Sequence, residues 1–191
     1  MRRLGPLFGV SHAAAHRIVD RHSPFLALDP PRAKLRAGEV VISDGTLVLT
    51  RDREVAASKN YRFSTNLQVM VHADTHLVLA VGRPSPGNRN DCRAFAESGV
   101  DTACGDATVP ADGAYRGTGA LIPHCRAVGQ VELVAWKEEH NRDHRRVRAH
   151  VEHVFSRMKN RKALRNCRRK GDGVFRAVSA VARMHDLALI G

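Results

Sequence analysis

No stretch of about 18 consecutive apolar residues occurs in this sequence, so it predicts no helix that spans a membrane. The chain begins with basic residues, Met1-Arg2-Arg3-Leu4, but the apolar core of a secretion signal does not follow them. A cytoplasmic protein is therefore expected by default.

Cysteine is sparse, and none of the four cysteines, at positions 92, 104, 125 and 167, forms a C-x-x-C pair. Free thiols packed in the interior are expected rather than disulfides or a zinc ribbon. His140 and His144 are four residues apart, a spacing that can bind zinc, but no third ligand with suitable spacing stands nearby.

Acidic residues are scarce relative to basic ones, 19 against 31, which leaves a formal net charge of +12. Such an excess predicts a polyanionic partner, and nucleic acid is the commonest. The excess is concentrated, because the segment from Lys137 to Lys170 holds 13 basic and 4 acidic residues. A basic protein on a membrane surface is the weaker alternative, because this segment has few aromatic residues for an interfacial face.

Three regions differ in their sequence pattern. Residues 1–28 have the form of a partial helix-turn-helix, with a turn at Gly9 and a helix capped by Ser11. That helix is expected to face inward with Ala14, Ala15, Ile18 and Val19, and outward with His12, His16 and Arg17. The first helix is nearly missing, so the piece looks trimmed, and an ordinary helical hairpin is the alternative. Residues 29–38 are predicted to be a linker, because paired prolines forbid helix.

Residues 39–191 alternate between strand and helix signals, which predicts an α/β domain with a mixed sheet flanked by helices. Expected strands are 40–42, 47–49, 61–72, 76–81, 108–111 and 121–122, with a hairpin turn at Asp74-Thr75. Expected helices are 90–97, 138–164 and 173–189, the first capped by Asn90 or Asp91.

Two aspartates, Asp44 and Asp112, are each expected to end a short strand. Carboxylates at strand ends can converge at one edge of a sheet and hold Mg²⁺, which prefers a few carboxylates together with water and phosphate. Each aspartate precedes a glycine, however, and an Asp-Gly pair is more often an ordinary turn.

The helix around Glu152 carries a third carboxylate. Its apolar face is predicted to contain Val147, Val151, Val154, Phe155 and Met158. Arg145, Arg148, Glu152 and Lys159 fall in a narrow stripe beside that face, so Glu152 is expected to be partly buried among bases. The alternative is an ion pair between Arg148 and Glu152 within the helix.

Four motifs in order resemble DDE-superfamily transposases of bacterial insertion sequences, of the insertion-sequence-five type. They are residues 40–46 around Asp44, the loop Pro86-Gly87-Asn88-Arg89-Asn90-Asp91, residues 111–117 around Asp112, and the spacing Arg148-x3-Glu152-x6-Lys159. The resemblance covers roughly residues 4–165. The family signature has Tyr where this chain has Arg145, and the amino-terminal region is shorter than in full-length relatives.

The resemblance implies a ribonuclease-H-like fold for residues 39–191 and two-metal chemistry with Mg²⁺ or Mn²⁺. Asp44, Asp112 and Glu152 would ligate two ions, and Asp91 would lie beside the site without binding metal. The predicted DNA contacts are Arg145, Arg148, Lys159, Arg116, His16 and Arg17. The partner would be double-stranded DNA, at terminal inverted repeats and a target site, with a homodimer assembling on it.

Three functions remain open at this point. The first is a transposase that cuts and joins DNA at the ends of an insertion sequence. The second is a truncated, catalytically inactive DNA-binding remnant, and the third a ribonuclease-H-like nuclease with a host role such as repair. Trp136 and Tyr115 are candidates to stack on bases or to pack in the core.

Overall fold

The computed structural model describes residues 4–26, 35–36, 38–53, 57–59, 62–165 and 167–191. Most of the predicted linker, 29–34 and 37, therefore lies outside the described residues, as do residues 1–3 and 27–28. Among the described helices none is both long and apolar enough to cross a membrane.

The long strand β3 (Arg62–His72) organises a five-stranded sheet, because every other strand of this sheet pairs with it. Its partners are β1 (Val41–Leu49), β2 (Ala57–Lys59), β4 (Val78–Val81) and β5 (Ser85–Pro86), all antiparallel. The register runs from Val41 opposite His72 to Leu49 opposite Ser64. The hairpin predicted at Asp74-Thr75 is confirmed, since turn residues there join β3 to β4.

The expected mixed sheet is wrong for these five strands. Among the described residues, parallel pairing occurs only as isolated bridges, between Val40 and Thr108, Thr50 and Cys167, and Pro110 and Leu121. The strand predicted at 108–111 does not extend beyond its bridges, because Pro110 has no N–H to donate to a ladder.

The helices are α1 (Leu4–Phe8), α2 (His12–Leu26), α3 (Asp91–Ser98), α4 (Val100–Cys104), α5 (Ala135–Lys159), α6 (Lys162–Arg165) and α7 (Asp172–Ile190), with a 3₁₀ turn η1 (Gly113–Tyr115). The predicted helix 138–164 is thus two helices, separated at Asn160 and Arg161. The cap of α3 is Asn90, whose side chain accepts the N–H of Cys92 at 2.9 Å. Helix α4 was not expected from the sequence.

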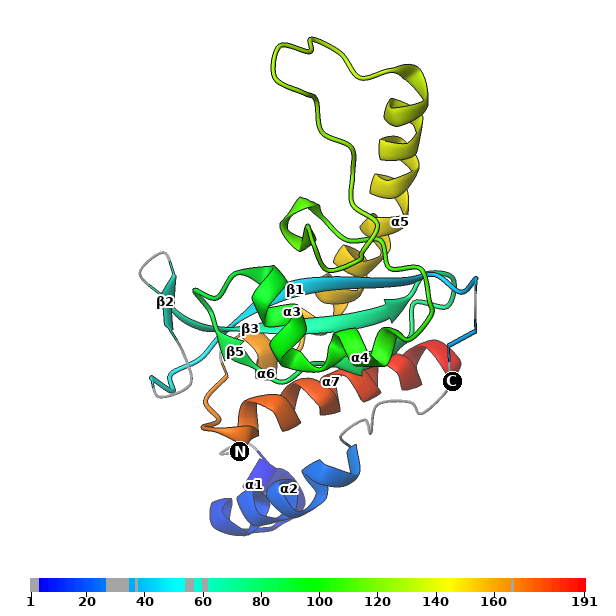
Figure 1. Ribbon diagram of the computed structural model, residues 1–191. Helices are drawn as coiled ribbons and strands as arrows, with labels where there is room; N and C mark the ends of the chain where they lie inside the picture. Colours follow the sequence, from blue (N-terminus) through cyan, green and yellow to red (C-terminus); the bar gives the residue numbers. More distant parts are fainter. Residues whose placement is uncertain (1–3, 27–34, 37, 54–56, 60–61, 166) are drawn as a thin grey trace.

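The sheet separates two hydrophobic cores, because successive residues of a strand point to opposite faces. Ile42 and Val71 lie in the core formed with α5, α6 and α7, where Val151, Val154, Phe155 and Val178 are buried. Their neighbours Val41 and Met70 lie in the other core, with Phe95 of α3 and Val100 of α4. The helical layers on the two faces can be followed in Figure 1.

The amino-terminal helix α2 packs against α7, on the far side of that helix from the sheet, and α1 packs against α2 (Figure 1). The predicted turn and cap are confirmed: Gly9 has φ +63°, and Ser11 Oγ accepts the N–H of Ala14 at 3.1 Å. Ile18 was expected to face inward but is 49% exposed, because α2 presents only a narrow edge, including the buried Ala15, to the rest of the chain.

All four cysteines are free, as predicted. Cys104 and Cys167 are buried and Cys92 is half-buried, but Cys125 is exposed, so the expectation of an interior position is wrong for that residue.

Candidate functional site

Asp44 lies in the middle of β1 rather than at the end of a strand. The strand continues through Gly45 because β3 supplies a partner for each residue, with Asp44 opposite Val69 and Gly45 opposite Gln68. The Gly45 N–H donates to Asp44 Oδ1 at 2.8 Å, and the Asp44 side chain is only 16% exposed. The Asp-Gly pair therefore places a nearly buried carboxylate in the sheet, not in a turn.

Asp112 reaches the same place from another segment. It caps the 3₁₀ turn η1, where its Oδ1 accepts the N–H of Ala114 at 2.7 Å. Its other oxygen, Oδ2, lies 4.0 Å from Nη2 of Arg148, and its side chain is 39% exposed. One oxygen thus fixes the local backbone while the other faces the site.

Arg148 of α5 joins the two aspartates. Its Nη2 donates to Asp44 Oδ2 at 2.9 Å, and its side chain is 20% exposed. The Nε of Arg148 is buried and has no hydrogen-bond partner within the described residues. A buried donor without a partner costs about 1–3 kcal/mol, so the protein alone does not fully satisfy this guanidinium.

The pKa of Asp44 is raised, chiefly because burial disfavours the ionised carboxylate and also because Asp112 is nearby. The guanidinium of Arg148 and the N–H of Gly45 lower this pKa but do not outweigh burial. The site therefore carries a carboxylate whose negative charge one arginine does not fully compensate. An additional cation would stabilise it.

Lys159 and Glu152 lie on the same edge of α5 as Arg148, by helical spacing. Lys159 is half-buried, and burial lowers the pKa of its ammonium. The negative charge of Asp44 opposes this shift without cancelling it, so the lysine interacts electrostatically with that carboxylate. Glu152 is exposed, which corrects the expectation of partial burial. No ion pair joins it to Arg148, because among the described residues that arginine pairs with Asp44 and Asp112.

A chain of buried polar side chains borders Asp44. Tyr115 Oη donates to Gln68 Oε1 at 2.6 Å, Gln68 Nε2 donates to Asn66 Oδ1 at 3.0 Å, and Asn66 Nδ2 donates to Asp91 Oδ1 at 2.6 Å. Asp91 is thus a neighbour of the site, as expected. Burial, followed by the charges of Asp44, Asp91 and Asp112, raises the pKa of Tyr115, which is therefore a neutral donor.

Sequence reasoning missed Asn66 and Gln68. The available signal was polar residues at every second position of β3, Ser64, Asn66 and Gln68, all nearly fully buried. A polar row on a buried strand face needs partners. Gly45 is part of the same arrangement, since a Cβ there would lie 2.7 Å from Gln68 Nε2 and 2.9 Å from Asp91 Oδ1.

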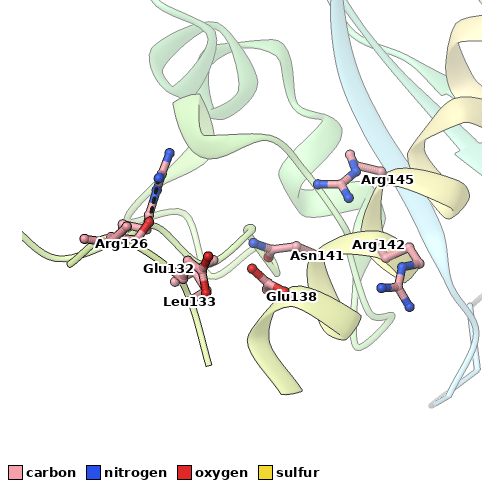
Figure 2. A pocket seen from close by; sticks show the side chains of 8 residues that line it. Arg126, Glu132, Leu133, Glu138, Asn141, Arg142 and Arg145 are labelled. Carbon is pink, nitrogen blue, oxygen red and sulfur yellow. Dashed lines mark hydrogen bonds between the residues drawn. The ribbon is translucent and has the colours of Figure 1, made fainter. Parts of the chain in front are cut away.

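The other predicted DNA contacts form no ion pair with Asp44 or Asp112 among the described residues. His16 pairs with Asp20 at 2.7 Å on α2, where Arg17 is exposed. Arg116 is exposed, and its guanidinium lies 3.8 Å from the sulfur of Cys125. Arg145 is exposed and lines a cavity of about 470 Å³ beside Arg142 (Figure 2).

The described residues contain no group of three or more His, Cys, Asp or Glu side chains placed to hold a metal ion. Asp44 and Asp112 approach one cation, the Arg148 guanidinium, and Glu152 does not join them in a cluster. His144, one of the two histidines with zinc-like spacing, lies with its Nε2 3.0 Å from the carbonyl oxygen of Leu121. Carboxylate oxygens of the Asp44–Asp112 kind fit the donor chemistry of Mg²⁺ or Mn²⁺.

In this basic α/β protein, two aspartates from separate segments meet one arginine. Together with the order of the sequence motifs, this arrangement is typical of an enzyme that transfers phosphoryl groups on DNA. Residues 36–187 match the family model described as the transposase DDE domain. The chain belongs to this family of transposases, enzymes that bind and cut DNA and are in general dependent on divalent metal ions.

One curated relative, from Streptomyces albus G, carries the name "Putative transposase for insertion sequence element IS112". It is 59% identical over 192 residues, an alignment that covers all of this chain and 75% of the relative. No solved structure matches the chain at comparable stringency.

Proposed function

We propose that this chain catalyses DNA strand cleavage and strand transfer at the ends of an insertion sequence. The observation that carries the proposal is the Asp44–Arg148–Asp112 cluster on the sheet of a chain that belongs to the DDE transposase family. The printed name of the IS112 relative supports the insertion-sequence setting.

Asp44, Asp112 and Glu152 are the proposed ligands of two Mg²⁺ or Mn²⁺ ions. The raised pKa of Asp44 supports a need for more positive charge there than Arg148 provides. When bound, such ions activate the attacking oxygen and stabilise the leaving one. Because Glu152 is exposed one helical turn beyond Arg148, we propose that it joins the two aspartates only when metal and DNA are bound.

The basic side chains then act on phosphate. Arg148 holds Asp44 in place and has an Nε donor that no described residue uses, and Lys159 lies on the same helix edge. They would orient the scissile phosphodiester while water breaks the P–O3′ bond, which leaves a 3′-hydroxyl. That hydroxyl would next attack a phosphorus atom of target DNA, with loss of the target's own 3′-oxygen.

Three finer assignments belong to the same proposal. A ribonuclease-H-like architecture is supported by the antiparallel sheet centred on β3 and by the parallel bridge of Val40 to Thr108 beside β1. A helix-turn-helix role for α1 and α2, with His16 and Arg17 toward DNA, rests on the confirmed turn and cap. The insertion-sequence-five type rests on the motif spacing alone.

The test is cleavage of labelled DNA that carries the element's own terminal repeats, with Mg²⁺ or Mn²⁺, by the wild type and by Asp112→Ala. Asp106→Ala is the matched control, because Asp106 is an exposed aspartate outside the cluster. We expect nicking at the repeat tips by the wild type and the control, and none by Asp112→Ala. Equal nicking by all three proteins would refute the assignment of Asp112, and salt-sensitive binding without nicking would leave the DNA-binding alternative.

A further inference from the structure

Residues 121–144, here called the arm, begin at Leu121, which is bridged to Pro110, and from there project beyond the sheet. The arm consists of the irregular segment 121–134 and the first turns of α5, which extend away from the rest of the molecule in Figure 1. It contains none of the three proposed metal ligands, so its role must be sought separately.

The arm is held together by its own contacts. Asn141 donates from Nδ2 to the carbonyl oxygen of His124 at 2.9 Å and accepts the His124 N–H at 2.8 Å. The ring of His124 lies edge-on to Trp136, with centroids 5.0 Å apart. At the far end of the loop, Arg126 donates to the carbonyl oxygen of Val131 at 2.9 Å. The loop and the first turns of α5 are therefore joined by defined contacts.

Large apolar side chains lie exposed on this element. Val128 is fully exposed, Val131 80% exposed, Trp136 59% and Val134 49%. Single exposed apolar residues are ordinary, but these four, together with Leu121 at 44%, on one arm suggest a contact surface. Aromatic anchors such as Trp136 commonly provide much of the binding energy in protein interfaces.

The charge of the arm differs sharply from that of the segment that follows it. Residues 121–144 contain three basic and four acidic residues, net −1, whereas residues 145–170 contain eleven basic and one acidic, net +10. A surface for DNA phosphates is expected to be basic. The segment after the arm meets that expectation, and the arm does not.

Both signs of charge surround a cavity of about 470 Å³ between the loop of the arm and α5. Arg126, Arg142 and Arg145 line it together with Glu132 and Glu138, and Figure 2 shows these side chains coming from the loop and from α5. In a two-fold interface the same patch meets itself, so a patch with acids and bases can pair each with the opposite charge of its copy.

We propose that the arm is the contact surface for a second copy of this chain, with Val128, Val131, Val134 and Trp136 at its centre and the charged rim of the cavity around them. The proposal commits to a protein partner because the arm is apolar and nearly neutral, and to a copy of itself because the rim is self-complementary. It does not depend on the strand-cleavage chemistry. It also offers a surface for the homodimer on DNA that the family resemblance implies.

Sedimentation equilibrium of the full chain without DNA, over a wide range of concentration, tests the proposal. We expect a monomer–dimer equilibrium in the wild type, and a dissociation constant at least about tenfold higher, or ~1.4 kcal/mol, in Val131→Asp and in Trp136→Ala. Val131 and Trp136 are exposed and lie outside both hydrophobic cores, so the sheet and its packed helices should tolerate the changes. Ile190→Asp, also at an exposed apolar residue but at the end of α7, should dimerise like the wild type. A wild type that stays monomeric, or arm variants that dimerise like it, would overturn the proposal.

A charge inversion tests the self-complementary rim directly. One variant carries Arg126→Glu with Arg142→Glu, and the other carries Glu132→Arg with Glu138→Arg. Each alone should associate more weakly than the wild type, and an equimolar mixture should recover dimers. If the equimolar mixture does not recover dimers, the two-fold pairing is wrong. The proposal also fails if the wild type remains monomeric and the arm variants instead lose affinity for duplex DNA.

Discussion

Replacing Gly45 with alanine tests how tightly the polar chain beside Asp44 is packed. An alanine Cβ would lie 2.7 Å from Gln68 Nε2, 2.9 Å from Asp91 Oδ1 and 3.2 Å from Asn66 Oδ1. Gln68 and Asn66 are only 1% and 2% exposed, and each is hydrogen-bonded on both sides, so neither can move away without losing a partner.

The expected cost follows from these contacts. Adding a methyl group to a filled interior costs about 1–3 kcal/mol. Straining one hydrogen bond of the chain from Tyr115 to Asp91 adds about 1 kcal/mol. We therefore expect Gly45→Ala to lower the free energy of unfolding by ~2–4 kcal/mol, and to displace the Asp44 carboxylate that precedes it.

Equilibrium unfolding in urea, followed by circular dichroism, measures this loss. Gly113→Ala is the matched control, because a Cβ at Gly113 meets nothing within 4 Å. The control should fall within about 0.5 kcal/mol of the wild type. If Gly45→Ala is as stable as Gly113→Ala, the close packing inferred around Asp44 is wrong.

Three further predictions concern charge. In thermal unfolding with and without metal, Mg²⁺ or Mn²⁺ should raise the melting temperature of the wild type and of Asp106→Ala, and raise that of Asp44→Asn much less. Equal shifts in all three proteins would contradict a metal site at Asp44. Burial raises the pKa of Asp186, so the folded chain holds that proton more tightly than the unfolded chain, and stability is lost as pH rises from about 4 through the folded pKa. Asp186→Asn should therefore gain stability relative to the wild type over that pH range in urea titrations, and a pH-independent difference would count against the assignment. Asp20→Asn should leave the free energy of unfolding nearly unchanged, because the pair of Asp20 with Arg169 is substantially exposed; a large loss would mean that the pair anchors α2.

Periodicity in the sequence predicted the regular elements well where they are long. The apolar face of α5, with Val151, Val154, Phe155 and Met158 buried, appears where 3.6-residue spacing puts it. The pattern did less well for short segments. The Asp-Gly pair at 44–45 is a common turn signal, but the pairing of β1 with β3 keeps it extended.

The candidate site was predicted in part. Residue order indicated Asp44, Asp112 and the α5 stripe, and the structure brings the two aspartates and Arg148 together. It does not bring Glu152 to them, because the exposure of a residue at the edge of a helix depends on what packs beside it and not on helical spacing alone. The buried amides of Asn66 and Gln68 became visible only with their partners.

The sequence by itself determined the family, through the order and spacing of its motifs, and the basic character that suits a DNA partner. These properties are local, and they are read residue by residue. Tertiary structure alone decided that Arg148 pairs with Asp44, 104 positions away, and that residues 121–144 stand clear of the sheet with their valines and Trp136 exposed. Such features depend on which segments the folded core brings together, and spacing along the chain carries little information about contacts at that distance.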